Sequence, residues 1–332
     1  MQGNHFESRS RRHTLPPSPR NGRTVFAPEA TTPHAALSPR AAFLLAHERL
    51  SLLANASPEP SVVIAAVDVA GQVVAARRVF HRHAVILGRH EQCGLRLPAH
   101  SIALRQLAAL VQLDGGRSVV HVRDLATRLP FLTEDRTPTA GVTADGPLFL
   151  GVGEYAIWFV PSELLVEGRG AEMAWNSLPP RTFSDRRPPV DGPVHPSQAL
   201  AQALPTRVTR VAPPLLLDGG DAPEIAWGVL RVEIGSRKEK RWVSAERLEQ
   251  GILLGRYSRC SVLVDAHEAT TSRVHALMLR LGTEVWVIDL ASTNGVSRDG
   301  ARLFAEVLRD TDRIQLGTQV IVDWTRTRHA QA

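Results

Sequence analysis

Short apolar runs rich in β-branched residues alternate with polar turns over two parts of the chain. Runs of this length that are bounded by Gly, Asp and Pro predict strands. Evenly spaced short strands without helices between them are typical of a β-sandwich. We therefore predict an all-β fold with two sandwiches. The runs lie at 62–67, 72–76, 84–87, 107–111, 119–122 and 155–160, and then at 226–234, 241–243, 252–254, 261–264, 275–281, 284–288, 313–316 and 319–322.

The prolines mark the boundaries of these two parts. Eight lie in 1–60, four in 61–160, eleven in 161–223 and none in 224–332. Because proline cannot donate to a β-ladder, the two stretches poor in proline are the sheet-forming ones. The predicted organisation is a disordered Arg/Pro-rich leader at 1–35, a short helix at 38–55, a first sandwich at 61–161, a Pro-rich linker at 162–223 and a second sandwich at 224–326.

The helix at 38–55 has a clear start signal. Ser38 is a good N-cap, and Pro39 suits the first helical position. Good helix formers follow, and Phe43, Leu50 and Leu53 fall near one face. We expect this face to pack on the helix's own domain, with binding to a partner as the alternative.

Composition narrows the classes of function. The net charge of +6 over 332 residues is concentrated in 1–40, which carries six Arg against two Glu, so it indicates a solvated leader in preference to a nucleic-acid arm. Two cysteines argue against a disulfide framework and for a reducing compartment. No apolar run approaches the roughly 18 residues of a membrane helix, and no secretory signal is evident. We expect a cytoplasmic protein.

The two sandwiches share landmarks at a near-constant offset. Gly88-Arg89 with Cys93 matches Gly255-Arg256 with Cys260, Asp124-Leu125-Ala126 matches Asp289-Leu290-Ala291, and Leu150-Gly151 matches Leu316-Gly317. The sandwiches are therefore predicted to be copies of one fold. Cys93 and Cys260 take equivalent positions, so we expect each to be buried in its own domain, without a bond between them.

Three polar islands in the second sandwich carry hydrogen-bond donors at the ends of strands. They contain Arg256, then Ser272 and Arg273, then Thr293 and Asn294. Arginine fits phosphate bidentately, and hydroxyl groups complete the donors around a tetrahedral oxyanion. No nucleophile with a base accompanies them, and no Gly-rich loop leads into a helix. We expect anion binding without catalysis, and neither a cofactor nor a metal.

These residues carry a family resemblance. Gly255-Arg256, Ser272-Arg273-Val274-His275, Asp289-Leu290, Ser292-Thr293-Asn294-Gly295 and Asp312-Arg313-Ile314-Gln315-Leu316-Gly317 resemble the signature of the forkhead-associated (FHA) domain. The resemblance covers about 225–325. It implies a sandwich of about eleven strands that binds phosphothreonine peptides through loops at one end. It also implies a role for each matching residue: Arg256 and Ser272 grip the phosphate, Arg273 and Thr293 assist, Asn294 binds the peptide backbone, and Gly255, His275 and Gly295 support the loops.

One departure from the family pattern follows Gly295. Arg298-Asp299-Gly300 stands where the family usually has a second Asn-Gly turn, and Asp-Gly suits a type I′ turn equally well.

The first sandwich resembles a degenerate FHA domain. The repeat aligns Leu104 with Ser272, Leu107 with His275, and Arg128-Leu129-Pro130 with Thr293-Asn294-Gly295, so only Gly88-Arg89 survives. Leucine donates no hydrogen bond, and we expect this copy to be a scaffold.

The leading hypothesis is a phosphothreonine-binding adaptor in Ser/Thr-kinase signalling, whose partner is a phosphorylated kinase or kinase substrate. A variant is self-association through a phosphorylated tail, which carries Thr14, Thr24, Thr31 and Thr32. The alternative is a phospho-independent scaffold subunit of a larger assembly such as a secretion apparatus. Nucleic-acid binding through the Arg-rich leader is a third hypothesis, and we expect no membrane partner.

Overall fold

The computed structural model describes residues 37–186, 205–214, 226–264 and 269–327. Our expectations for the leader at 1–35 and for the linker residues 187–204 and 215–223 lie outside these ranges. Among the described residues, no helix is both long and apolar enough to cross a bilayer.

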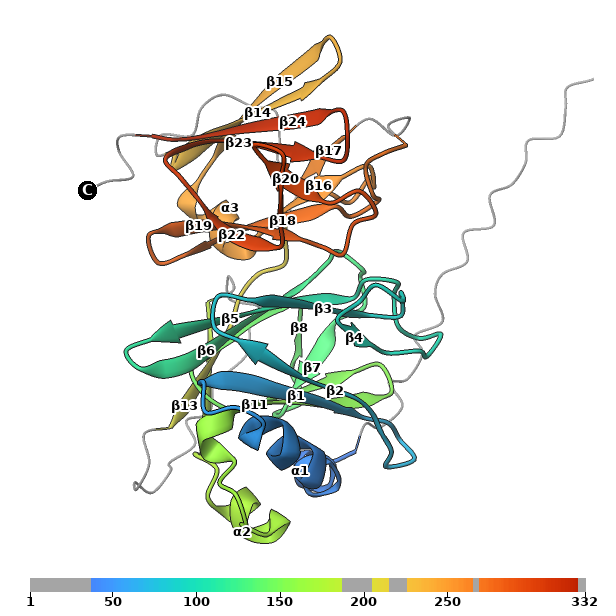
Figure 1. The fold of residues 1–332 in the computed structure, drawn as a ribbon, viewed down its shortest axis with the longest axis vertical. Coiled ribbons are helices and arrows are strands. Elements are labelled where there is room, and N and C mark those ends of the chain that lie inside the picture. The colour runs from blue at the N-terminus through green and yellow to red at the C-terminus, as the bar shows by residue number, and fades with distance from the viewer. Residues whose placement is uncertain (1–36, 187–204, 215–225, 265–268, 328–332) are drawn as a thin grey trace, which may run out of the picture. The chain divides into compact units, whose positions relative to one another are not determined.

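Eleven strands build the first sandwich (Figure 1). One sheet has the order β2-β1-β11-β10-β7-β8, and the other contains β9-β6-β5-β3-β4. The strands are β1 Ser61–Val67, β2 Val73–Phe80, β3 Ala84–Gly88, β4 Leu95–Arg96, β5 Leu107–Asp114, β6 Arg117–Asp124, β7 Phe131–Thr133, β8 Pro138–Thr139, β9 Gly141–Ala144, β10 Leu148–Val152 and β11 Tyr155–Pro161.

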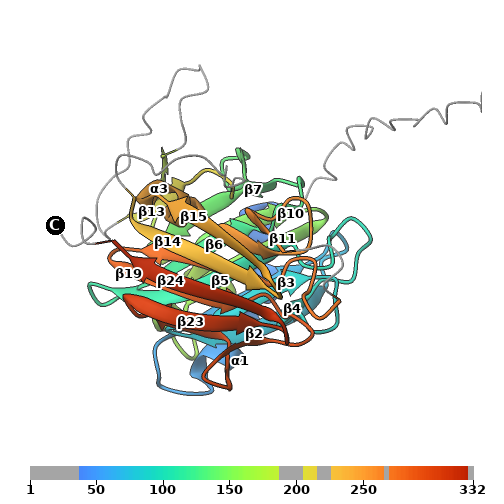
Figure 2. The same ribbon diagram turned by 90° about the horizontal axis from the view of Figure 1, so that it is seen from above.

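The second sandwich repeats this topology strand for strand. Its sheets have the orders β15-β14-β24-β23-β20-β21 and β22-β19-β18-β16-β17, and Figure 2 shows β14, β24 and β23 side by side. The all-β prediction, with about eleven strands in each sandwich, is confirmed for the described residues. The strands are β14 Gly228–Ile234, β15 Arg237–Val243, β16 Ile252–Gly255, β17 Val262–Leu263, β18 Ala276–Leu281, β19 Glu284–Asp289, β20 Val296–Arg298, β21 Ala301–Leu303, β22 Ala305–Leu308, β23 Thr311–Leu316 and β24 Val320–Arg326.

The turn between β20 and β21 has the geometry expected of Asp-Gly. Arg298 pairs with Ala301 across it, and Asp299 and Gly300 have φ of 51° and 78°. Positive φ at both central residues is the requirement of a type I′ turn.

Strand β1 is buried on both faces. Val62 and Ile64 point into the core between the two sheets, whereas Val63 and Ala65 pack in a second cluster with helix α1, Pro39–Asn55. Figure 1 shows α1 lying against β1 and β11. The helix begins where the sequence predicts, because the Oγ of Ser38 accepts the Ala41 amide hydrogen bond at 3.3 Å.

Three further helical segments were not expected. The 3-10 helix η1, Ser162–Leu164, and helix α2, Ala171–Asn176, lie in the range predicted as linker, and α3, Ala245–Gln250, precedes β16. Helix α2 brings Trp175 edge-on to Trp158, with the ring centroids 5.9 Å apart. The linker range therefore contributes to the apolar cluster around α1.

Two strands from the same range extend the first sandwich. We call them the strap: β12, Arg181–Asp185, and β13, Thr206–Arg210. Strand β13 pairs antiparallel with β9, and β12 pairs parallel with β13. These segments differ from the predicted Pro-rich linker, because their backbone groups pair with the sheet.

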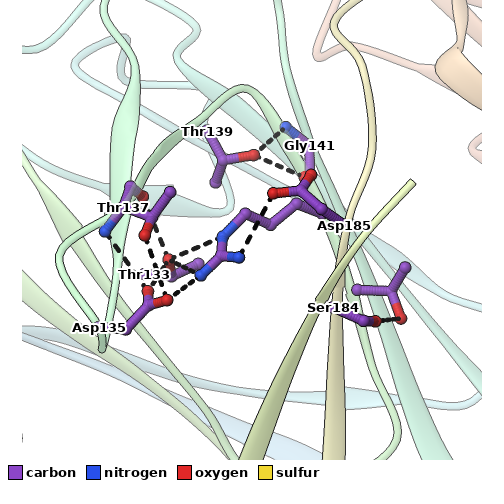
Figure 3. A network of polar contacts seen from close by, with 9 residues as sticks. Thr133, Asp135, Thr137, Thr139, Gly141, Ser184 and Asp185 are labelled. Atoms are coloured by element: carbon purple, nitrogen blue, oxygen red, sulfur yellow. Dashed lines mark hydrogen bonds and ion pairs between the residues drawn. The ribbon is translucent and has the colours of Figure 1, made fainter. Parts of the chain in front are cut away.

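A buried arginine fastens the strap. The side chain of Arg210 is 6% exposed and lies within 3.5 Å of the Asp185 carboxylate. It also donates to the hydroxyl of Thr133 at 3.3 Å and forms an ion pair with Asp135. Figure 3 shows Thr133, Asp135 and Asp185 converging on this site. Because the guanidinium is buried among polar partners, its loss leaves those partners unsatisfied.

We expect Arg210→Ala to loosen the strap selectively. Hydrogen bonds to charged groups contribute about 1.5–3 kcal/mol, so amide exchange at Val208 should become at least tenfold faster. The matched control is Arg207→Ala on the same strand, since that side chain is 78% exposed in its ion pair with Asp145. Equal exchange in the two variants would contradict an anchoring role for Arg210.

The two sandwiches share a buried apolar cluster. Both belong to one compact unit, 33–332. The cluster contains Ile86, Cys93, Ala108, Leu110 and Leu125 from the first sandwich and Leu253, Cys260, Leu277, Trp286, Ile288 and Leu290 from the second. These residues belong to β3, β5, β16, β18 and β19 and to the loops that follow β3, β6, β16 and β19.

Both cysteines lie in this shared cluster as free thiols. The absence of a bond between them agrees with the prediction, whereas burial of each thiol in its own domain does not. Each thiol donates to a main-chain oxygen at 3.3 Å, Cys93 to Leu104 and Cys260 to Arg273. Burial raises the pKa of both thiols, that of Cys260 to about 12, so they remain protonated at neutral pH.

Candidate functional site

The strand order brings the three polar islands to one end of the second sandwich. Strand β18 pairs antiparallel with both β16 and β19, with Leu254 opposite Ala276 and Ala276 opposite Asp289. The end of β16, the start of β18 and the end of β19 therefore meet. The loops that carry Arg256, Ser272 and Thr293 leave from this edge.

Gly255 allows the first two loops to approach closely. A Cβ at this position would lie 2.4 Å from the carbonyl oxygen of Arg273. The next amide, that of Arg256, donates to the carbonyl of Ser272 at 3.3 Å, and that of Tyr257 donates to the carbonyl of Arg273 at 3.0 Å. Only glycine permits this contact between the two backbones.

His275 connects the second loop to the third. The side chain is fully buried; its Nδ1 accepts the Ser272 amide hydrogen bond at 3.0 Å, and its Nε2 lies 2.9 Å from the carbonyl oxygen of Gly295. These partners require the neutral ring with the proton on Nε2. Burial lowers the pKa of His275, which favours that neutral form.

The third loop is held by side chains at both of its ends. The amide of Ser292 donates to Asp289 Oδ1 at 3.0 Å, and the amide of Gly295 donates to Ser292 Oγ at 3.0 Å. Between them, the amide of Thr293 donates to Ser272 Oγ at 3.1 Å. Ser272 and Thr293 are therefore direct neighbours.

Asn294 and Thr293 present exposed side chains at this edge. Asn294 Nδ2 donates to the carbonyl of Thr270 at 2.7 Å. The amide oxygen of Asn294 has no hydrogen-bond donor in the described part of the chain. That oxygen is an acceptor which a ligand's amide group could use.

Two arginines bring positive charge to the loops. The Arg256 side chain is half-buried, and its Nε is buried without a hydrogen-bond partner in the described ranges. Arg273 is exposed. Within those same ranges, neither guanidinium forms an ion pair. A guanidinium without an acidic partner can donate to the oxygens of an anionic ligand.

Two residues of this edge escaped the sequence prediction. Thr270 accepts from Asn294 through its carbonyl and from the Thr318 amide through its hydroxyl, at 3.3 Å. Arg302, on β21, donates to the Asp289 carboxylate at 3.3 Å. Its side chain also packs against Gly295, where an added Cβ would lie 2.9 Å from Arg302 Nε. Neither belongs to a sequence motif, and Arg302 lies thirteen residues from its partner, so only the folded chain reveals them.

The first sandwich builds the same connections with different residues. Leu87 pairs with Leu107 as Leu254 pairs with Ala276. Gln106 therefore takes the position of His275, and Ala103 takes that of Ser272. The predicted alignment of Leu107 and Leu104 with these positions is wrong by one residue, because the loop before β18 is longer than its counterpart before β5.

Gln106 reproduces the hydrogen bonds of His275. Its Oε1 accepts the Ala103 amide hydrogen bond at 2.9 Å, and its Nε2 donates to the carbonyl of Leu129 at 3.1 Å. Ala103, however, has no hydroxyl to match that of Ser272. The expectation that this copy lacks the hydroxyl donor therefore remains, now with alanine at the position.

The family model of the FHA domain matches residues 252–317. Residues 252–317 are an FHA domain. Among curated proteins, none matches the chain.

Several solved structures, among them FHA domains, also match parts of the chain. The FHA-1 domain of Rv1747 from Mycobacterium tuberculosis is 24% identical over 31% of this chain and 100% of that one, with a TM-score of 0.25. The Slr1951 protein from Synechocystis sp. is 21% identical over 31% and 99%, with a TM-score of 0.28. The FHA domain of CT664 from Chlamydia trachomatis is 18% identical over 30% and 97%, with a TM-score of 0.27.

Proposed function

We propose that the second sandwich binds phosphothreonine-containing peptides. The observation that carries this proposal is the junction at Ser272, where three loops are joined by hydrogen bonds beside Arg256, whose guanidinium forms no ion pair in the described ranges. A phosphothreonine carries about −1.5 to −2 charges and several strong acceptor oxygens. The phosphate oxygens can accept hydrogen bonds from the guanidinium groups of Arg256 and Arg273.

Each residue has a distinct part in the proposed complex. Arg256 and Ser272 hold the phosphate, and Arg273 and Thr293 add donors at its open side. Asn294 binds the peptide backbone through its amide oxygen, while its nitrogen keeps the bond to Thr270. Gly255, His275 and Gly295 hold the loops through the contacts described above. Binding of this kind needs no bond-breaking step.

At the level of the whole protein, we propose an adaptor in Ser/Thr-kinase signalling in the cytoplasm. The partner would be a phosphorylated protein, either a kinase or its substrate. The match of residues 252–317 to the FHA domain supports this reading. Self-association is a further form of the same recognition, in which the second sandwich binds a phosphorylated threonine of the protein's own tail. The candidates are Thr14, Thr24, Thr31 and Thr32, which lie outside the described residues.

The test is titration of the full chain with paired phosphothreonine and threonine peptides from a degenerate library, followed by calorimetry on the best sequence. We expect binding of the phosphorylated form only, and Arg256→Ala should weaken it at least tenfold, since a hydrogen bond between charged groups contributes about 1.5–3 kcal/mol.

The matched control is Arg309→Ala, which removes the same charge from an exposed residue next to Leu308. Leu308 pairs with Val285, at the opposite end of β19 from Asp289. Equal affinity for the two peptides would favour a phospho-independent scaffold. An equal loss in the two variants would show that only net charge matters and would overturn the assigned site.

A further inference from the structure

Arginines from each sandwich reach across the shared cluster to the other. Arg105, which precedes β5, donates through Nη2 to the carbonyl of Ala291. In the opposite direction, Arg259 donates through Nη1 to the carbonyls of Ala126 and Thr127, at 3.2 Å each. Both contacts reach the last residue of an element that the two copies share, Asp-Leu-Ala at 124–126 and at 289–291.

The two accepting alanines are equivalent and share an uncommon backbone conformation. Ala126 and Ala291 have φ of 59° and 54°, in the left-handed region that L-residues with a Cβ rarely adopt. A contact that surrounds each turn must therefore hold it in place. The acceptors are equivalent but the donors are not, because Arg105 takes the position of Val274 and Arg259 that of Gln92.

These contacts fall on the loops that carry the proposed phosphothreonine donors. Ala291 lies two residues before Thr293, and Arg259 lies three residues after Arg256. Beneath them, Cys260 and Leu290 are buried in the shared cluster with Cys93 and Leu125. The first sandwich therefore contacts two of the three loops of the site at their bases.

We propose that Arg105 is a positioning residue for the phosphothreonine site, so that the first sandwich, although it lacks the hydroxyl donor, is a working part of the reader. This inference rests on the proposed function of the second sandwich. Ordering a loop on binding costs free energy, and a loop held in the bound conformation avoids that cost. Arg105 supplies this pre-organisation through the carbonyl of Ala291.

The Arg105 side chain is well enclosed where it contacts the turn at Ala291. Arg105 is half-buried, and its Nε has no hydrogen-bond partner among the residues that the structure describes. Its Nη2 is directed at one main-chain oxygen. A guanidinium so enclosed has few alternative conformations, which makes it a firm support for the turn.

The test uses the full chain and three variants: Arg105→Ala, Arg105→Lys and the control Arg96→Ala. Arg96 is exposed on β4, and its loss removes the same charge from the same sandwich. Two quantities are measured: the affinity for the phosphothreonine peptide, and the amide exchange of Thr293 and Gly295 without peptide. Exchange reports loop order directly, whether or not a peptide binds.

We expect Arg105→Ala to weaken peptide binding about fivefold and to speed exchange at Thr293 and Gly295, with Arg105→Lys intermediate and Arg96→Ala unchanged. Wild-type affinity and exchange in Arg105→Ala would overturn the inference. So would an equal loss of affinity in Arg96→Ala, or exchange accelerated uniformly over the second sandwich. Failure of the proposed function looks different, because Arg256→Ala would then leave peptide binding unchanged while the exchange effect of Arg105→Ala would persist.

Discussion

Replacing His275 with alanine is expected to lower the free energy of unfolding of the second sandwich by about 3 kcal/mol or more. The imidazole is fully buried and bonds to the amide of Ser272 and the carbonyl of Gly295. Alanine leaves both groups unsatisfied and creates a cavity beneath the loops. Denaturant titration followed by fluorescence measures the loss.

Glutamine at the same position provides the matched variant. Gln106 makes the equivalent pair of hydrogen bonds in the first sandwich, to Ala103 and Leu129. We therefore expect His275→Gln to recover most of the stability that His275→Ala loses, together with phosphopeptide binding. If glutamine were as destabilising as alanine, the two positions would not be equivalent in their roles.

His275→Gln also isolates the contribution of His275 to the pH dependence of the unfolding free energy. Burial lowers its pKa in the folded protein, whereas the unfolded chain has the ordinary value near 6.5. The unfolded state therefore binds a proton more readily, so the stabilisation is present above pH 6.5 and is lost as the pH falls below it towards the folded pKa. Burial also lowers the pKa of His47 and, with Arg123 nearby, that of His121 to about 3. His275→Gln should lose less stability than wild type between pH 6.5 and 5, with the difference due to His275 alone.

The sequence predicts the scaffold of the candidate site well. Gly255, Ser272 and Thr293 each interrupt or follow an apolar run, so the loops were expected at the ends of strands, as the structure has them. The burial of His275 was also predictable, since a histidine between apolar residues at the start of a strand is usually buried, whereas its role in supporting the loops is implied by the family resemblance.

The one-residue error at Ala103 has a simple physical origin. The motif before it, Gly-Arg, and the motif after it, Asp-Leu-Ala, recur in the second sandwich 167 and 165 residues later. These similar offsets suggest that the segments between the two motifs have nearly the same length. In fact the loop before β18 is longer than its counterpart before β5, while the hairpin β5-β6, at eight residues per strand, is longer than β18-β19, at six. The loop is two residues longer and the hairpin four residues shorter, so the next landmark is again within two residues of the first offset. Loop lengths vary freely because loops lie at the surface.

The strap and the shared cluster could not be predicted because they depend on partners distant in sequence. Arg210 meets Asp135 and Thr133 seventy-five and seventy-seven residues away. Strands that bear the shared cluster, such as β16 with Leu253 and Leu254, are apolar on both faces. The sequence of such a strand shows that both faces are covered, but not by what. A helix covers the outer face of β1, whereas the other sandwich covers that of β16.

Replacing Gly255 with alanine is expected to be among the most damaging changes in the site. The new Cβ would lie 2.4 Å from the Arg273 carbonyl oxygen and 3.1 Å from Cys260 Sγ. The first of these is backbone and cannot swing aside, so the loops of Arg256 and Ser272 must separate. We expect a loss of about 3 kcal/mol in unfolding free energy and, because Arg256 follows directly, a loss of phosphopeptide affinity at least as large as in Arg256→Ala.

Gly282→Ala distinguishes crowding from backbone conformation. Gly282 lies in the hairpin between β18 and β19, has φ of 59°, and has no atom within 4 Å of its missing Cβ. Alanine there costs only the left-handed conformation, about 1–2 kcal/mol, and should leave peptide binding intact. If Gly255→Ala bound peptide as well as Gly282→Ala does, the close approach of the two loops would not be what holds Arg256 in place.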